Sequence, residues 1–138
     1  MGDRRQAREL ALQALFFLDV DKSDPKKNLE SFCAFNEEKL TPGIKAFFME
    51  LVNGVMENRL KIDSLLNTYS KNWKITRMPV VDRNIMRVAI VEFLNHSDIP
   101  PSVTINEAVE IGKKFGTKDS GSFINGVLDR IKLQEGFK

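Results

Sequence analysis

The sequence holds very few of the residues that build covalent or metal-centred sites. It has one cysteine, Cys33, and one histidine, His96, in 138 residues. These counts exclude a disulfide framework and a Cys/His metal cluster, and we expect no cofactor. Cys33 lies in an apolar run and His96 in a polar turn, which disfavours a nucleophile and base pair between them.

Long apolar runs are also missing. No stretch approaches the roughly 20 apolar residues that span a bilayer, and the basic N-terminus is not followed by the uncharged core of a signal peptide. We therefore expect a cytoplasmic protein without membrane contact. The net charge is only +2, so the distribution of charge along the chain says more about partners than its total.

Helical periodicity is what the chain does have. Hydrophobic residues make up 42% of it and charged residues 29%, which is ordinary for a soluble globular domain. Apolar residues recur at spacings of three and four, and no alternation with a period of two appears. The sequence therefore predicts one all-α domain over residues 1–138, with about six or seven helices.

Three arginines open the first helical pattern: Arg4, Arg5 and Arg8. Positive charge in the first turns opposes the helix dipole by a few tenths of a kcal/mol, so helix stability alone does not favour these residues. We interpret the three arginines as a phosphate-binding arm. The alternative is a frayed, solvated terminus.

The same helix carries a second apolar pair, Leu12 and Phe16, four residues apart and off the main apolar stripe. Burying each side chain is worth about 1.5–3 kcal/mol, which is much to leave in water. Either another helix of the chain or a partner protein is expected to cover them.

The middle of the chain predicts a long helix from Pro42, or two nearly collinear ones, ending near Asn72. Gly54 and Asn58 are the positions where we expect a kink. Its stripe of aliphatic and aromatic residues is typical of a core-facing helix rather than a cofactor site.

The next helix is predicted from Pro79 to about Asn95 and is apolar almost all round, which indicates a central, buried position. Its first turn carries Asp82, Arg83 and Arg87. We expect these charges to bring that end of the helix to the surface.

Two helical patterns meet at a basic turn within residues 105–131. Thr104 and Glu107 have the spacing of a capping box, and Gly116 is a natural helix stop. Asp119 or Ser120 is expected to cap the last helix.

Residues 112–120 do not form a nucleotide-binding P-loop, because neither the glycine-to-lysine order nor a preceding strand is present. Lys113, Lys114 and Lys118 fit the phosphates of single-stranded RNA better, and Phe123 could stack on a base. Periodicity alone slightly favours a core position for Phe123.

Three separated motifs stand out: INEAVEIGKKFG followed by FINGVLDRI, the opening RRQARELALQALF, and the central VVDRNIMRVAIVEF. Together they resemble the NusB family of bacterial transcription antitermination factors. The resemblance covers nearly the whole chain in the family's order. It implies two roughly perpendicular three-helix bundles, binding of boxA-type RNA with the ribosomal protein NusE, and indirect association with RNA polymerase and other Nus factors on ribosomal RNA operons.

The resemblance also assigns residues. One arginine common in the family is replaced by Gln6. Asp119 would repel phosphate, and we expect it to moderate RNA binding. The implied RNA contacts are Arg4, Arg5, Arg8, Tyr69, Lys118, Asp119 and Phe123. The implied partner-docking residues are Leu12, Phe16 and Asp82.

These implications favour a non-enzymatic RNA-binding adaptor. One alternative is a domain related to the N-terminal part of ribosomal RNA cytosine methyltransferases, although no glycine-rich cofactor loop follows a strand here. A second is a protein–protein adaptor without an RNA role. A homodimer formed through the partner-docking surface is a further possibility.

Overall fold

The computed structural model describes residues 2–71 and 73–138. That part of the chain forms seven α-helices, one short 3-10 helix and no strand, so the predicted all-α class is confirmed. The helices are α1 (Asp3–Val20), α2 (Pro25–Phe35), α3 (Pro42–Glu57), α4 (Arg59–Tyr69), the 3-10 helix η1 (Ile75–Arg77), α5 (Val80–Asn95), α6 (Pro101–Phe115) and α7 (Ser120–Glu135).

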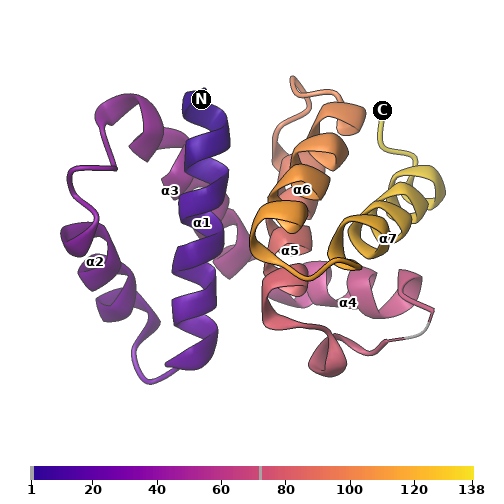
Figure 1. The fold of residues 1–138 in the computed structure, drawn as a ribbon, viewed down its shortest axis with the longest axis horizontal. Coiled ribbons are helices and arrows are strands. Elements are labelled where there is room, and N and C mark those ends of the chain that lie inside the picture. Colours follow the sequence, from indigo (N-terminus) through magenta and orange to yellow (C-terminus); the bar gives the residue numbers. More distant parts are fainter. Residues whose placement is uncertain (1, 72) are drawn as a thin grey trace.

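The helices form two groups (Figure 1). The first contains α1, α2 and α3, and the second contains α4, α5, α6 and α7. Contacts of α5 with α1 and α3 join the two groups. In the view of Figure 1, α1 and α6 both begin at the top and run downward, and the turn between α6 and α7 lies at the lower end of α6, above α4. The two-bundle arrangement implied by the family resemblance is thus present, with four α-helices rather than three in the second group.

The core is centred on α5, as its nearly continuous apolar sequence predicts. Met86 and Ile90 of this helix are fully buried, and they share one core with residues such as Phe48 of α3 and Ile124 of α7. Each such side chain contributes about 1.5–3 kcal/mol by leaving water. Helices from both groups therefore depend on α5 for their packing.

The predicted break in the long middle helix falls at Asn58, between α3 and α4. The Asn58 side-chain amide donates to the carbonyl of Gly54 at 2.9 Å, and this carbonyl also accepts from the Asn58 backbone N–H at 3.1 Å. Gly54 faces α5 so closely that a Cβ there would lie 2.6 Å from Cγ1 of Val91. The helix that follows ends at Tyr69, and the predicted end near Asn72 lies outside the described residues.

The predicted capping box at the start of α6 is wrong. The helix begins one turn earlier, at Pro101, because proline is well suited to the first helical position. Thr104 therefore lies inside α6, where its hydroxyl donates to Glu92 of α5 at 3.0 Å. Gly116 does end α6, as predicted. Asp119 occupies the N-cap position of α7, but its side chain makes no capping hydrogen bond.

A buried polar network joins α1, α4 and α5 around Asp19. The Asp19 carboxylate accepts from Arg87 at 2.9 Å, from Arg59 at 2.9 Å and from Asn84 at 3.0 Å. Burial would raise the pKa of Asp19, but these donors outweigh burial and lower it from 3.8 to about 2. The carboxylate therefore stays ionised and holds the three helices together.

The network corrects one expectation about α5. Its first turns were predicted to reach the surface because they are charged, yet Asp82 is 3% exposed and Arg87 is 4% exposed. The charge of Arg87 is compensated by Asp19 and by Asp63 of α4, to which it donates at 2.9 Å, whereas Asp82 accepts a hydrogen bond from the neutral hydroxyl of Ser120.

Candidate functional site

The three N-terminal arginines belong to a helix rather than to a flexible arm, because α1 already begins at Asp3. Arg4 is the most accessible of them, with 56% of its side chain exposed. It lies 3.5 Å from Asp98 and 5.2 Å above the ring centre of Phe47. An exposed ion pair at this distance is weak, so Arg4 can exchange Asp98 for another anion.

Arg5 is partly exposed and shares its charge with α6. Its Nε donates to Glu107 at 3.0 Å, and its Nη2 contacts the other oxygen of the same carboxylate. The hydrogen bond from Arg5 is the largest cause of a lowered Glu107 pKa, and burial opposes it. A phosphate approaching Arg5 therefore competes with a carboxylate that is firmly ionised.

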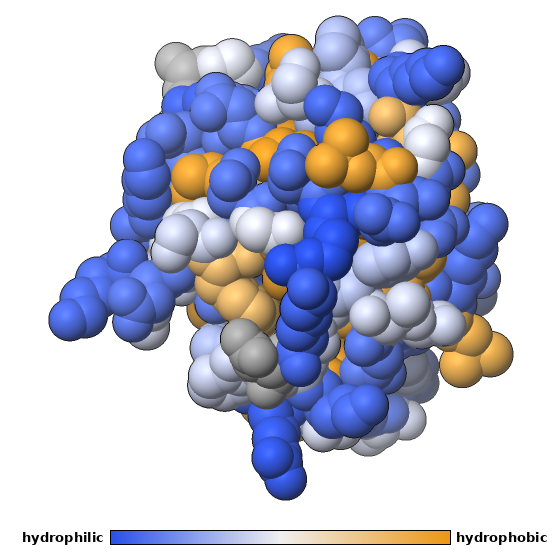
Figure 2. All heavy atoms as spheres, turned by 90° about the vertical axis from the view of Figure 1, so that its right-hand side faces the viewer, coloured by the Kyte–Doolittle hydropathy of each residue, from blue (hydrophilic) through white to orange (hydrophobic). Residues whose placement is uncertain are grey.

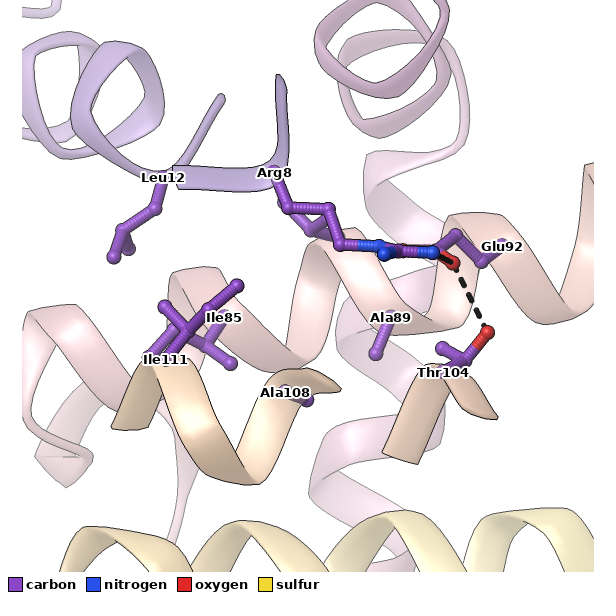
Figure 3. Close-up of a pocket in the computed structure, with 9 residues that line it drawn as sticks. Arg8, Leu12, Ile85, Ala89, Glu92, Thr104, Ala108 and Ile111 are labelled. Atoms are coloured by element: carbon purple, nitrogen blue, oxygen red, sulfur yellow. Dashed lines mark hydrogen bonds and ion pairs between the residues drawn. The ribbon is translucent and has the colours of Figure 1, made fainter. Parts of the chain in front are cut away.

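Arg8 is buried, so its prediction as a phosphate contact is contradicted. Only 5% of its side chain is exposed, and its guanidinium donates to both oxygens of Glu92 at 2.8 Å. A further hydrogen bond reaches Glu107 at 3.2 Å. Figure 3 shows the guanidinium pointing toward Glu92, with Thr104 hydrogen-bonded to the same carboxylate. The space beside them is about 10 Å³, which is too small for a nucleotide.

A shallow cleft of about 360 Å³ lies between α1 and α6 and contains two cations. Arg5 and Lys114 line it together with Glu9 and Glu110. Lys114 is half exposed and donates to Glu9 at 2.8 Å. The sequence placed Lys114 near the basic turn, but its position opposite α1 follows only from the tertiary fold, in which ion pairs link α6 to α1. The cleft thus holds two cations and two carboxylates, and its cations lie between the first turn of α1 and the end of α6.

The turn between α6 and α7 keeps two of its predicted residues exposed, Lys118 and Asp119. Beneath them the Ser120 hydroxyl donates to Asp82 at 2.7 Å and accepts from the Thr117 backbone N–H at 2.9 Å. The small turn residues thus serve as internal connectors, and Gly116 lets the chain pass close to Ser120.

The position of Asp82 contradicts its prediction as an exposed docking residue. Its carboxylate is almost fully buried under the α6–α7 turn. Burial raises the pKa of Asp82, and the hydrogen bond from Ser120 partly opposes this. Asp82 can support the shape of the turn but has little surface of its own to offer a partner protein.

The aromatic neighbour of Phe123 is Trp73, which belongs to none of the motifs in the sequence. The ring centres lie 6.4 Å apart, Phe123 is partly buried, and Trp73 is 45% exposed. Tyr69 is held elsewhere, with its hydroxyl bonded to Glu135 near the far end of α7. The one tryptophan of the chain, placed between two helical patterns, was the signal that could have drawn attention to Trp73.

Leu12 and Phe16 of α1 differ in their exposure to solvent. Leu12 is 3% exposed and belongs to the core, so the expectation that a partner covers it is wrong. Phe16 is 41% exposed, and Phe17 and Val20 beside it are also exposed. Packing within the chain therefore covers Leu12 but leaves an apolar end of α1 open.

The surface formed by the second group of helices is mainly polar. Figure 2 shows mostly hydrophilic residues on this side, with small hydrophobic areas separated from one another. No helix within the described residues is long and apolar enough to cross a membrane. The fold and the exposed groups thus define an all-helical, two-bundle protein with cations on α1, α6 and the α6–α7 turn.

Comparison with known proteins identifies this class more closely. The profile of the NusB family matches residues 5–132. A transcription antitermination protein NusB of Desulforapulum autotrophicum is 60% identical over 133 residues, which cover 96% of this chain and 93% of the relative. The chain belongs to the NusB family.

Solved structures agree with this assignment. NusB of T. maritima has a TM-score of 0.83 and 38% sequence identity, with 95% of this chain and 91% of that chain covered. A chain from a crystal structure of the antitermination factors NusB and NusE in complex with double-stranded RNA also has a TM-score of 0.83. Its identity is 23%, with 96% and 97% of the two chains covered, so this second likeness supports the fold alone.

Proposed function

We propose that the chain is a non-enzymatic RNA-binding adaptor in transcription antitermination. It binds boxA-type single-stranded RNA together with the ribosomal protein NusE and supports transcription of ribosomal RNA operons in association with RNA polymerase and other Nus factors. The observation that carries the proposal is the family match over residues 5–132, combined with accessible cations on the face shared by α1 and α6. A NusB of the same fold was crystallised with NusE and double-stranded RNA, and the membership of this chain in the NusB family is what carries that kind of partner into the proposal.

Arg4, Arg5 and Lys118 are the proposed phosphate contacts, and Lys114 lies between them along the surface. About 12 Å of helix rise separates Glu107, the partner of Arg5, from the end of α6 at Phe115, so several nucleotides are needed to reach all of these cations. The burial of Arg8 reduces the predicted contacts from four to three. The electrostatic part of binding is therefore smaller than the sequence alone suggests.

Salt dependence tests this part of the proposal. Three phosphate contacts on a single strand predict a roughly 20-fold loss of affinity between 50 and 200 mM salt, from a slope near 0.7 per phosphate. Fluorescence anisotropy of a labelled boxA-type RNA, with and without the ribosomal partner, measures it. Affinity that does not change with salt would contradict the assigned cations. Absence of RNA binding, alone and with the partner, would favour the protein–protein adaptor.

Asp119 is proposed to moderate RNA binding, because it is exposed one residue from Lys118 and its carboxylate makes no capping hydrogen bond. Asp119→Asn removes a negative charge beside the phosphate path without removing a cap. We expect tighter RNA binding in the same anisotropy assay, and unchanged or weaker binding would argue against the moderating role.

The open end of α1 around Phe16 is proposed as the docking surface for NusE. A central aromatic in an interface commonly contributes 2 kcal/mol or more, so Phe16→Ala should weaken partner binding by roughly 30-fold or more while leaving the fold intact. Phe35→Ala is the matched control, because Phe35 is 90% exposed on α2, another helix of the first group. Unfolding of the Phe16 variant would instead assign Phe16 to the core. Light scattering of both variants tests whether the same surface forms a homodimer.

A further inference from the structure

Two ion pairs link α1 to α6, and they are arranged crosswise. Arg5 of α1 donates to Glu107 of α6 at 3.0 Å, and Lys114 of α6 donates to Glu9 of α1 at 2.8 Å. Each helix thus presents one cation and one carboxylate to the other. We call these four residues the α1–α6 clasp. Because both of its cations lie on the proposed RNA-binding face, the clasp decides how much positive charge a phosphate can meet there.

The carboxylates of the clasp are much less exposed than its cations. The side chain of Glu107 is 15% exposed, against 37% for Arg5. The side chain of Glu9 is 11% exposed, against 52% for Lys114. A long, exposed cationic side chain can turn toward solvent, whereas a carboxylate enclosed by the fold cannot follow it. A phosphate that binds either cation therefore has to displace a fixed carboxylate from it.

The two pairs differ in what remains after the cation leaves. Glu107 also accepts from the buried Arg8 at 3.2 Å, so it keeps a cation when Arg5 turns away. For Glu9, Lys114 is the one ion-pair partner within the part of the chain that the structure describes. Leaving a largely enclosed carboxylate without a cation is unfavourable, because neither water nor a counter-charge then compensates it. Arg5 is therefore released more easily than Lys114.

We propose that Glu9 is an autoinhibitory residue that keeps Lys114 from the phosphates of RNA. Arg5 exchanges Glu107 for a phosphate, and Arg8 compensates the carboxylate that Arg5 leaves. Lys114 stays with Glu9 and remains an unused phosphate contact. This inference rests on the proposed RNA-binding function and adds to it a contact that limits the affinity for RNA.

Replacing Glu9 by glutamine tests the role of its charge. Glu9→Gln keeps the size of the side chain and an oxygen acceptor but removes the charge that holds Lys114. The lysine then becomes an additional phosphate contact, so the slope of log affinity against log salt concentration should steepen by about 0.7. If the contact contributes nothing at about 1 M salt, this slope corresponds to roughly fivefold tighter binding at about 100 mM. Anisotropy of a labelled boxA-type RNA over a range of salt concentrations measures both quantities.

Two controls separate the release of Lys114 from the loss of a negative charge. A double variant that combines Glu9→Gln with Lys114→Gln should return to the salt slope of the native protein, because the released cation is absent. Glu110→Gln removes the same charge from the same cleft, but Glu110 pairs with Lys113, whose side chain is already 63% exposed. It should change the affinity by no more than about twofold and leave the slope unchanged. Circular dichroism checks that each variant is folded.

Lys114→Gln in the native background is an independent measurement. Since Lys114 does not contact RNA while Glu9 holds it, this variant should keep the native salt slope. A slope reduced by about 0.7 would show that Lys114 already binds a phosphate, and would overturn the autoinhibitory role of Glu9.

The remaining outcomes separate this contact from the wider function. An unchanged slope in Glu9→Gln, or tighter binding that persists without Lys114, would overturn the autoinhibition and leave the proposed function standing. Absence of binding of boxA-type RNA by the native protein and by the variants, with or without the ribosomal partner, would overturn both.

Discussion

Replacing Arg8 by methionine removes the cation that lies between Glu92 of α5 and Glu107 of α6. Glu92 is only 1% exposed as a side chain, so the substitution leaves a buried carboxylate with a hydroxyl, that of Thr104, as its remaining donor. Breaking a buried ion pair in this way costs about 3–5 kcal/mol. That is a large part of the roughly 5–15 kcal/mol by which a domain of this kind is stable.

The measurement is urea and thermal unfolding followed by circular dichroism. At roughly 3–5 °C per kcal/mol for a domain of this size, Arg8→Met should lower Tm by about 10–20 °C. Adding Glu92→Gln removes the stranded charge and keeps an acceptor for Thr104. The double variant should therefore recover much of the lost stability. If it is no more stable than the single variant, the unpaired carboxylate is not the cause of the loss.

Arg4→Met is the matched control, because Arg4 lies one helical turn earlier and is exposed. It should cost at most about 1 kcal/mol of stability but should reduce the salt slope of RNA binding by about 0.7. We thus expect Arg8→Met to lower stability more than RNA affinity, and Arg4→Met to lower RNA affinity more than stability. Normal stability combined with lost RNA affinity in Arg8→Met would refute the structural role assigned to Arg8.

Two further predictions concern stability. The lowered pKa of Asp19 stabilises the fold above pH 3.8, and this contribution is lost as the pH falls toward 2. Asp19→Asn should therefore lower the free energy of unfolding by roughly 2 kcal/mol at pH 7, and by progressively less below pH 4, when measured by urea unfolding. An equal difference at pH 7 and pH 2.5 would contradict the cause given. Gly54→Ala places a Cβ against Val91 and should destabilise the protein by about 1–3 kcal/mol, because α3 and α5 cross there. In the control, Gly126→Ala, the new Cβ has nothing within 4 Å, so the substitution should stabilise α7 slightly. Equal changes in Tm for the two variants would rule out the steric explanation.

Local sequence signals predicted the helices well. Pro42 begins α3, Gly116 ends α6, and Asn58 marks the break between α3 and α4. Each of these signals depends on backbone geometry within a few residues, so the sequence contains all the information needed. The wrong start predicted for α6 also has a local cause. The sequence offers two start signals, Thr104 as an N-cap and Pro101 at the first helical position, and the helix begins at Pro101.

The candidate site was predicted less completely. The basic turn and Phe123 could be found from the sequence because they lie close together in it. The groove of about 480 Å³ beside the α6–α7 turn could not be predicted, because one of its walls is Trp73. Trp73 is far from Phe123 along the chain and lies beside it only because α4 and α7 both pack against α5. Lys114 likewise meets Glu9 only in the tertiary fold, where ion pairs link α6 to α1.

The sequence by itself determined that this is an all-helical protein, where most of its helices begin and end, and which family it resembles. Only the tertiary structure decided which charges face water. Arg4 and Arg8 share one face of α1, so helical periodicity cannot distinguish them. Their environments differ because Glu92 of α5 and Glu107 of α6 enclose the guanidinium of Arg8, while Arg4, one turn earlier, keeps more than half of its side chain exposed beside Asp98.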